Sequence, residues 1–327
     1  MRRLSVIIPN YNYGKFIGSA IGSALAVEWP DIEVIVVDDG STDDSHSVIR
    51  GFGPRITAIF QQNSGPRVAC NVGFAVSTGD VVIFLDSDDV LDPLIGREIA
   101  AVWRPGISKV QVQMQRINSD GHSIGGRFPK YRHVPTAEEI RRWMTTTSAY
   151  PTPPGSGNAY ARSFLTKLFP LDDSCGDATD SACLAAAPFL GDVLTVARPL
   201  ARYRQHGGNR SSLAADPARL TAQIQRALQR HRFALGFSAE PPPQDTMAPL
   251  FRGRHLLQMR VAERRMLGGE PPLPTDSRRR MVRDSFANLT APGPESIWLR
   301  AAISGWCLAT IVAPSPLARW LIRRRFA

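Results

Sequence analysis

The sequence predicts an α/β protein whose mostly parallel sheet carries helices on both faces. Two observations carry this prediction. Apart from Ser5, residues 4–8, 34–37 and 81–85 are runs of β-branched and other apolar side chains, as is typical of strands buried on both faces of a parallel sheet. Stretches of helix length lie between these runs, so strand and helix alternate as right-handed crossover connections require.

The remaining elements follow from the same patterns. The predicted strands are residues 4–8, 34–37, 56–60, 81–85, 110–115 and 193–203, and the predicted helices are residues 15–25, 42–51, 66–77, 92–103, 136–144 and a helix within 172–192. In residues 110–115 apolar side chains alternate with glutamines, and the Asn-Ser-Asp-Gly sequence at 118–121 predicts a hairpin turn. A proline- and glycine-rich loop is expected at 151–157.

The charge distribution divides the chain near residue 210. Residues 1–210 carry 21 basic and 21 acidic side chains, whereas residues 211–327 carry 18 arginines and 8 acidic residues, so the second region holds the whole net charge of +10. We therefore predict an α/β domain over 1–210 and a basic, helical C-terminal region over 211–327. A neutral body argues against a nucleic-acid partner, which a uniformly basic surface would indicate. A generally arginine-rich composition is the plainer explanation of the same charge.

The C-terminal region also contains an apolar segment. Residues 297–312 include Trp298 but are interrupted by Arg300, and they are too few to span a bilayer, which takes about 20 apolar residues. Aromatic and aliphatic side chains then alternate with arginines up to Phe326. This pattern suits a helix lying in the headgroup layer of an anionic membrane, next to a lipid-linked acceptor. Packing of these helices within the protein is the alternative, and the sequence leaves both open.

The N-terminus and the cysteines predict the compartment. The apolar run after Arg3 ends at Pro9, too soon for the core of a signal peptide. The four cysteines show no metal-ligand spacing and no pattern of a disulfide scaffold. We expect a cytoplasmic protein, or one bound peripherally to the cytoplasmic face of a membrane.

Three polar clusters follow predicted strands directly, at residues 9–11, 38–41 and 86–89. Ligands of open α/β sheets bind beyond the carboxyl ends of the strands. The crowded carboxylates of 86–89 suit Mg²⁺ or Mn²⁺, with diphosphate oxygens completing the coordination; an acidic turn ahead of the next helix is the alternative. In 38–41, a carboxylate can accept a hydrogen bond from a nucleobase, or the segment is simply a turn in which Ser41 or Thr42 caps a helix.

With their order and spacing, these stretches resemble the family-2 glycosyltransferases of the GT-A fold, a Rossmann-like architecture. The matching segments are Ser-Val-Ile-Ile-Pro-Asn-Tyr-Asn at 5–12, Glu-Val-Ile-Val-Val-Asp-Asp-Gly-Ser-Thr-Asp at 33–43, Asn-Val-Gly at 71–73, Thr-Gly-Asp at 78–80 leading to Asp-Ser-Asp-Asp at 86–89, and Tyr-Arg-Gln-His-Gly-Gly-Asn at 203–209. The resemblance covers residues 4–95 and returns at 200–209.

The resemblance implies roles for particular residues. Pro9 and Tyr11 would line the base and ribose pocket, and Asp39 would bind the nucleobase. Asp86 and Asp88 would form the Asp-x-Asp pair that holds Mn²⁺ or Mg²⁺ and the donor, with Asp88 as the direct metal ligand. His206 would approach the diphosphate or the metal, unless it only closes a turn.

Two departures from the family pattern concern the site. The family usually has an arginine before Asn-x-Gly, where this chain has Cys70; Arg67, one helical turn earlier, is the candidate to replace it at the diphosphate. The family also usually has a Glu-Asp pair whose aspartate is the general base. Here the stretch is Gly-Asp-Ala-Thr-Asp-Ser at 176–181, which favours Asp180 as the base, with Asp177 second.

The implied function is metal-assisted, inverting transfer of a sugar from a nucleotide-diphosphate sugar, with UDP-sugars favoured, to an acceptor hydroxyl in polysaccharide or glycoconjugate synthesis. The alternative is a non-catalytic nucleotide-sugar-binding or scaffold protein that keeps the GT-A fold. A dinucleotide-dependent oxidoreductase is disfavoured, because no Gly-x-Gly-x-x-Gly follows the first strand. A nucleotidyltransferase would require a glycine-rich triphosphate loop, which is also missing from the sequence.

Overall fold

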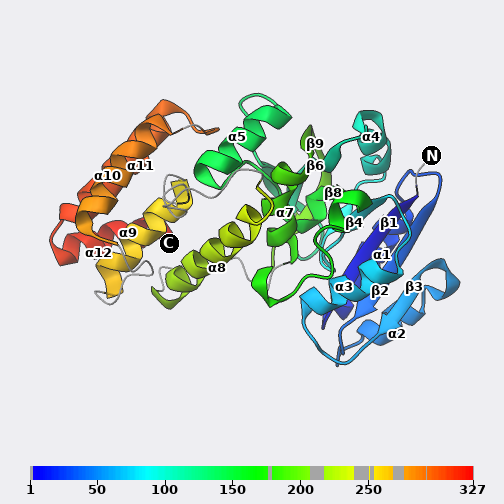
Figure 1. Cartoon of the computed structure of the whole chain (residues 1–327). Coiled ribbons are helices and arrows are strands. Elements are labelled where there is room, and N and C mark those ends of the chain that lie inside the picture. The colour runs from blue at the N-terminus through cyan, green and yellow to red at the C-terminus, as the bar shows by residue number, and fades with distance from the viewer. Residues whose placement is uncertain are drawn as a thin grey trace. The chain divides into compact units, whose positions relative to one another are not determined.

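The computed structural model describes residues 3–175, 179–206, 217–238, 250, 254–267, 276–291 and 293–326. Contacts between Cα atoms divide the chain into two compact units. The first comprises Met1–Glu138 and Pro151–Gly208, and the second Glu139–Tyr150 and Asn209–Ala327. In Figure 1 the strands belong to the first unit, whereas the second is drawn with helices. The assignment of residues 1–210 and 211–327 to separate domains stays a prediction.

The parallel half of the sheet forms where the apolar runs predict it. Its strands are β1 (Leu4–Asn10), β2 (Ile32–Asp38), β3 (Thr57–Phe60) and β4 (Val81–Phe84), which lie side by side in the order β3-β2-β1-β4. They are connected by helices α1 (Gly14–Leu25), α2 (Ser45–Arg50) and α3 (Pro66–Val76). Because all four strands run in one direction, their carboxyl ends lie along one edge.

Helices α1 and α3 cover opposite faces of this half. Ile17 and Ile21 of α1 belong to the same buried cluster as Val6 and Val34. On the other face Gly73 of α3 lies against β1, where an added Cβ would stand 2.4 Å from Cγ2 of Ile7. A side chain there would push the helix off the sheet, which explains the glycine of the Asn-Val-Gly segment.

The other half of the sheet is mixed in direction. Beyond β4 come β8 (Asn158–Ala161), β6 (Ile107–Ile117), β9 (Asp192–Arg204) and β5 (Val90–Leu91), while β7 (Ser123–Phe128) pairs with β6. Strand β8 is antiparallel to both β4 and β6, and β6 is parallel to β9. The predicted hairpin joins β6 to β7, with Asn118 N–H donating to the carbonyl of His122 over 2.8 Å. Helices α4 (Ile95–Val102), α6 (Arg162–Leu165) and α7 (Thr179–Leu190) complete the unit.

Strand β6 differs from the sequence expectation in its burial. An alternating pattern indicates a strand with one face exposed to solvent. However, Gln111 and Gln113 are as buried as Val110 and Val112. The reason is that segments outside the sheet cover the face that carries these glutamines, and the carbonyl of Pro129 in one of them accepts from the Gln113 amide over 2.8 Å. The Gln111 amide is satisfied there by the carbonyl of Pro151 and the Thr195 hydroxyl.

The second unit is built from helices in the residues that the structure describes. They are α5 (Ala137–Thr147, most of which belongs to this unit), α8 (Pro217–Leu235), α9 (Arg254–Leu267), α10 (Arg278–Thr290), α11 (Ile297–Val312) and α12 (Ser315–Phe326). The apolar faces of α11 and α12 contribute Ile303, Ile322 and Phe326 to its core. Arg260 is fully buried and ion-paired with Asp276 and Asp284. None of the described helices combines the length and the apolar character needed to cross a bilayer.

Candidate active site

The three polar clusters meet at the carboxyl edge of the parallel strands. The amide nitrogen of Asn10, the last residue of β1, donates to Asp38 Oδ2 over 2.7 Å, and Asp39 N–H donates to the Asn10 carbonyl over 2.8 Å. The hydroxyl of Ser87, after β4, donates to the carbonyl of Pro9 over 2.6 Å. The ends of β1, β2 and β4 are therefore joined into one polar surface.

Asp38 organises the turn after β2. Its buried carboxylate accepts hydrogen bonds from Ser41 N–H at 2.9 Å and from the Ser41 hydroxyl at 2.7 Å, and it lies 2.8 Å from Nε2 of His46. Ser41 is therefore not the cap of α2. Asp43 accepts from the N–H of Ser45, the first residue of that helix, over 3.0 Å.

Asp39 holds the loop between β3 and α3. Its Oδ1 accepts from Ser64 N–H at 2.8 Å and from the Gln61 amide at 2.7 Å, and its Oδ2 accepts from Gly65 N–H at 2.8 Å. Oδ2 thus has one lone pair left for a further donor. Tyr11, which is 43% exposed, and the half-buried Pro9 lie at the end of β1. Nucleobase binding by these three residues stays a prediction.

The Asp-x-Asp pair lies beside His206. Nε2 of His206 is 2.9 Å from Oδ2 of Asp88. The imidazole also contacts the rings of Tyr13 and Phe16, with centroids 5.8 and 5.1 Å away. Arg204 fixes the backbone between the two segments, because its Nε donates to the carbonyl of Asp88 over 2.8 Å. His206 is therefore held next to the acidic cluster.

Asp180, at the start of α7, lies close to Asp86. Gly155 separates them: a Cβ added at Gly155 would stand 3.5 Å from Oδ2 of Asp86 and 3.7 Å from Cβ of Asp180. The pKa of Asp86 rises to about 7, first because surrounding protein removes water from the carboxyl, then because Asp180 and Asp88 are negatively charged. Solvent still reaches the exposed side chain, which tempers the rise. This crowding is the electrostatic condition that a cation relieves.

Asp89 is the third aspartate of the acidic cluster that follows β4. It is buried, and dehydration together with the charges of Asp86 and Asp88 holds its pKa well above the ordinary value. The N–H of Arg204 donates to Oδ1 of Asp89 over 3.0 Å. Asp89 therefore ties β9 to the end of β4.

The donor set fits a hard divalent cation whose coordination a ligand completes. In the part of the chain that the structure describes, no group of three or more His, Cys, Asp or Glu side chains is arranged to hold a metal ion by itself. Two carboxylates, Asp86 and Asp88, instead face a crowded edge that is open to solvent. Mg²⁺ and Mn²⁺ commonly take one or two carboxylates and add substrate phosphate oxygens.

The other predicted residues lie as follows. Arg67 forms an ion pair with the exposed Asp173, and this pairing raises the pKa of the Arg67 guanidinium. Nη1 of Arg67 is buried and has no hydrogen-bond partner in the described residues. Cys70 is a buried residue of α3. Asp177 lies outside the described residues. Assignments of these residues to diphosphate binding and catalysis stay predictions.

Sequence reasoning missed Lys109. This side chain of β6 is fully buried, with Nζ 2.8 Å from the Thr152 hydroxyl and 3.0 Å from Oε1 of Gln111. Dehydration holds its pKa well below the ordinary value, against the attraction of the Cys183 and Asp180 groups. A lysine immediately before the predicted strand 110–115 was the only available signal. Its contact with Thr152 anchors the loop that carries Gly155.

This sheet, with an Asp-x-Asp pair after β4 and a histidine returning from β9, defines a glycosyltransferase of the GT-A fold. The family model described as glycosyl transferase family 2 matches residues 5–169, and the chain belongs to that family.

Individual relatives agree with this assignment. An uncharacterized glycosyltransferase of Nostoc, alr2836, is 38% identical over 220 residues, which cover 65% of this chain and 68% of the relative. The uncharacterized glycosyltransferase YibD of Escherichia coli is 38% identical over 94 residues, 28% of this chain and 27% of that protein.

Solved structures share the fold. Residues 1–349 of S. aureus TarS, in complex with UDP-GlcNAc, superpose with a TM-score of 0.59 at 17% identity, covering 99% of this chain and 91% of that one. The mannosyltransferase PcManGT of Pyrobaculum calidifontis, in complex with GDP-Man and Mn²⁺, gives a TM-score of 0.54 at 17% identity, covering 98% and 85%.

Proposed function

We propose that this protein transfers a sugar from a nucleotide-diphosphate sugar to an acceptor hydroxyl, with a divalent cation and with inversion at the anomeric carbon. One observation carries the proposal. Asp86 and Asp88 from the end of β4, His206 from the end of β9 and Asp180 from the start of α7 converge at the carboxyl edge of the sheet. The groups proposed to bind the donor, to stabilise the leaving group and to activate the acceptor are thus close to one another.

The donor would lie across the ends of β1, β2 and β4. Pro9, Tyr11 and Asp39 would contact the base and ribose, and Arg67 would approach the diphosphate through its unpartnered Nη1. We favour a UDP-sugar. The UDP-GlcNAc bound to TarS and the GDP-Man and Mn²⁺ bound to PcManGT support a nucleotide sugar and a divalent cation here.

Asp88 and Asp86 would hold Mn²⁺ or Mg²⁺, which when bound neutralises charge on the departing nucleoside diphosphate. In the reaction the acceptor oxygen forms a bond to the anomeric carbon as the bond from that carbon to the diphosphate oxygen breaks. Asp180 takes the proton of the acceptor hydroxyl, with Asp177 as the second candidate for this base. Proton transfer of this kind contributes about 10²–10⁴-fold to the rate. His206, 2.9 Å from Asp88, would orient that carboxylate and would lie near the diphosphate.

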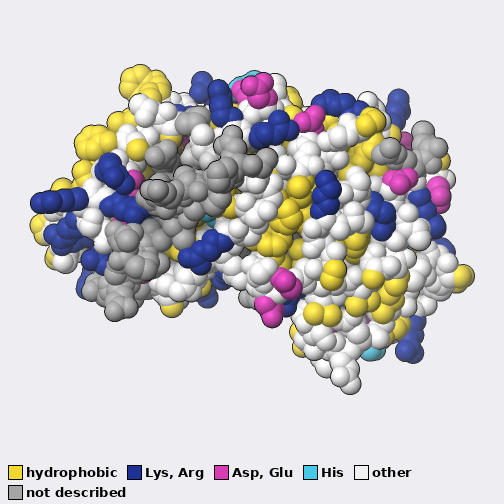
Figure 2. Space-filling model, in the orientation of Figure 1, with side chains coloured by type: hydrophobic (Ala, Val, Ile, Leu, Met, Phe, Trp, Pro, Cys, Tyr) yellow, Lys and Arg dark blue, Asp and Glu magenta, His cyan; other side chains and the backbone are white. Residues whose placement is uncertain are grey.

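We also propose that the second unit contacts an anionic membrane surface, which would suit a lipid-linked acceptor in polysaccharide or glycoconjugate synthesis. Trp298 is 82% exposed, Val312 77% and Trp320 52%. Figure 2 shows basic and hydrophobic side chains next to one another over the helices at the left of the view. Such a mixture suits the headgroup layer. Ile303 of α11 and Phe326 of α12 lie on the buried faces of these helices, which ordinary packing within the unit explains.

Nucleotide binding and turnover test the proposal in sequence. Melting temperature is measured with UDP, GDP, dTDP and CMP, with and without Mn²⁺, and the selected base directs an assay of nucleoside diphosphate release from the corresponding sugars. Metal-dependent binding followed by release supports the enzyme. Metal-dependent binding without release from any sugar tested, with a range of acceptor alcohols present, would instead identify a non-catalytic nucleotide-sugar-binding protein.

A further inference from the structure

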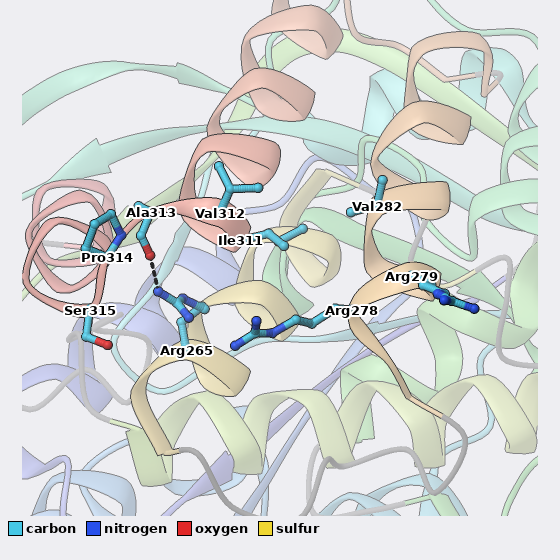
Figure 3. A pocket seen from close by; sticks show the side chains of 9 residues that line it. All are labelled: Arg265, Arg278, Arg279, Val282, Ile311, Val312, Ala313, Pro314 and Ser315. Carbon is cyan, nitrogen blue, oxygen red and sulfur yellow. Dashed lines mark hydrogen bonds between the residues drawn. The ribbon is translucent and has the colours of Figure 1, made fainter.

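The second unit contains a cavity far removed in sequence from the catalytic motifs. Its volume is about 620 Å³, and it lies between the end of α9, the start of α10 and the turn from α11 to α12 (Figure 3). All the lining residues belong to positions 265–315, so the cavity is formed within this unit. It is therefore a separate site from the acidic edge of the sheet.

One wall of the cavity is positively charged. Figure 3 shows Arg265 of α9 and Arg278 of α10 extending toward the same space, whereas Arg279 points away. Arg265 donates to the carbonyl of Ala313, and its Nε is buried without a hydrogen-bond partner in the described residues. Arg278 is exposed. Two guanidinium groups on one cavity repel each other unless an anion lies between them.

The neighbouring carboxylates do not supply that anion. Asp276 and Asp284 are both engaged by the buried Arg260. Among the residues that the structure describes, neither Arg265 nor Arg278 has a carboxylate partner. The positive end of the α10 dipole adds to the potential, because Arg278 is its first residue.

The opposite wall is apolar. It is formed by Val282, Ile311 and Val312, and the 77% exposed Val312 leaves this wall open to solvent. A small hydrophilic anion would pair with the arginines but would leave the apolar wall in contact with water. A ligand with a phosphate and an adjoining hydrocarbon chain would satisfy both walls, because guanidinium groups bind phosphate oxygens through paired hydrogen bonds.

We infer that this cavity binds the phosphate of a phosphorylated lipid, whose first methylenes lie on Ile311 and Val312. The phosphate lies between Arg265 and Arg278 and accepts hydrogen bonds from their guanidinium groups. The inference deepens the proposed membrane contact and rests on it, because it names the lipid chemistry that the second unit recognises. It does not depend on catalysis.

The test uses the full-length protein and a monomeric ligand, so that it is separate from vesicle binding. Calorimetry with dihexanoyl phosphatidate, below its critical micelle concentration, should give saturable binding. Inorganic phosphate should bind at least about tenfold more weakly, since it leaves the apolar wall unfilled. Dihexanoyl phosphatidylcholine should also bind more weakly, because its choline brings a positive charge to the arginines.

Variants then locate the site. Arg278→Gln removes an exposed side chain and should weaken phosphatidate binding at least about tenfold, and Arg265→Gln should do the same. Arg226→Gln on α8, exposed and outside the cavity, is the charge-matched control and should change nothing. Val312→Ser should weaken phosphatidate but leave phosphate unaffected.

Three results would overturn the inference. The first is the absence of saturable phosphatidate binding. The second is equal affinity for phosphatidate and inorganic phosphate, which would identify a simple anion site. The third is phosphatidate binding that persists in both arginine variants. Flotation with anionic vesicles is measured in parallel. If the Arg278→Gln variant loses phosphatidate binding and still binds vesicles, the protein contacts the membrane through a surface other than this cavity. In that case the broader membrane proposal stands.

Discussion

The imidazole of His206 lies 2.9 Å from the carboxylate of Asp88, although the two residues are 118 positions apart in the chain. This contact joins the end of β9 to the end of β4. It brings a residue from the returning segment to the acidic pair proposed to hold the metal. The ring contacts with Tyr13 and Phe16 leave the imidazole little freedom to turn away.

Asp88→Asn should abolish Mn²⁺-dependent nucleotide binding without unfolding the protein, because an amide is a poor ligand for a hard cation. Calorimetric titration of nucleotide with and without Mn²⁺ measures this. Asp31→Asn removes an exposed carboxylate ahead of β2, at the opposite edge of the sheet, and should bind like the wild type. Unchanged affinity in Asp88→Asn would remove Asp88 from the metal site.

The metal-free protein should lose stability as the pH rises toward 8. The pKa of Asp86 is raised to about 7 in the fold by dehydration and by the charges of Asp180 and Asp88. Its protonated form is thus favoured in the folded state, and the associated stability is lost as the pH rises from about 4 through 7. In Asp86→Asn, the melting temperature of the metal-free protein should fall less steeply with rising pH than in the wild type.

Mn²⁺ provides the complementary measurement. It should raise the melting temperature of the wild type more at pH 8 than at pH 5.5, since protons compete with it at the lower pH. A melting temperature of metal-free protein that increases steadily from pH 5 to pH 8 would contradict the assigned direction of the shift.

Asp180→Asn should lower turnover at least about a hundredfold while leaving donor affinity nearly unchanged. The physical reason is that the amide cannot accept the proton of the acceptor hydroxyl. Turnover and nucleotide-sugar affinity are measured on the same preparation. If Asp177→Asn has this effect and Asp180→Asn does not, the base is Asp177, three residues earlier in the chain.

Gly155→Ala tests whether the gap between Asp86 and Asp180 is used. The added methyl would make ordinary contacts of 3.5 to 3.7 Å with these residues, so the fold should tolerate it. Turnover should nevertheless fall, because the methyl occupies the space beside both carboxylates. Gly157→Ala is the contrasting variant: its Cβ would stand 2.7 Å from Cβ of Pro153, and melting temperature should drop. Full activity in Gly155→Ala would show that neither substrate enters this gap.

The sequence predicts the parallel strands and the acidic clusters at their ends because both are local features. Residues 4–8 and 81–85 have no polar side chain except Ser5, and the buried sheet confirms them. Burial of Lys109 and Gln111 depends instead on the loop that carries Pro151 and Thr152, which no local pattern in β6 reveals. The hydrogen bonds of Asp39 to Ser64 and Gly65 likewise depend on how a distant loop folds back.

The release of nucleoside diphosphate from a nucleotide sugar tests the central claim most directly. Purified full-length protein is incubated with UDP-sugars, and with the sugars of any other base that binding selects, in the presence of Mn²⁺ and acceptor alcohols. The account predicts product formation that EDTA stops, that added Mn²⁺ restores, and that Asp88→Asn and Asp180→Asn both lack. Release that is unaffected by EDTA and by both substitutions would contradict a metal-assisted transfer at this edge of the sheet.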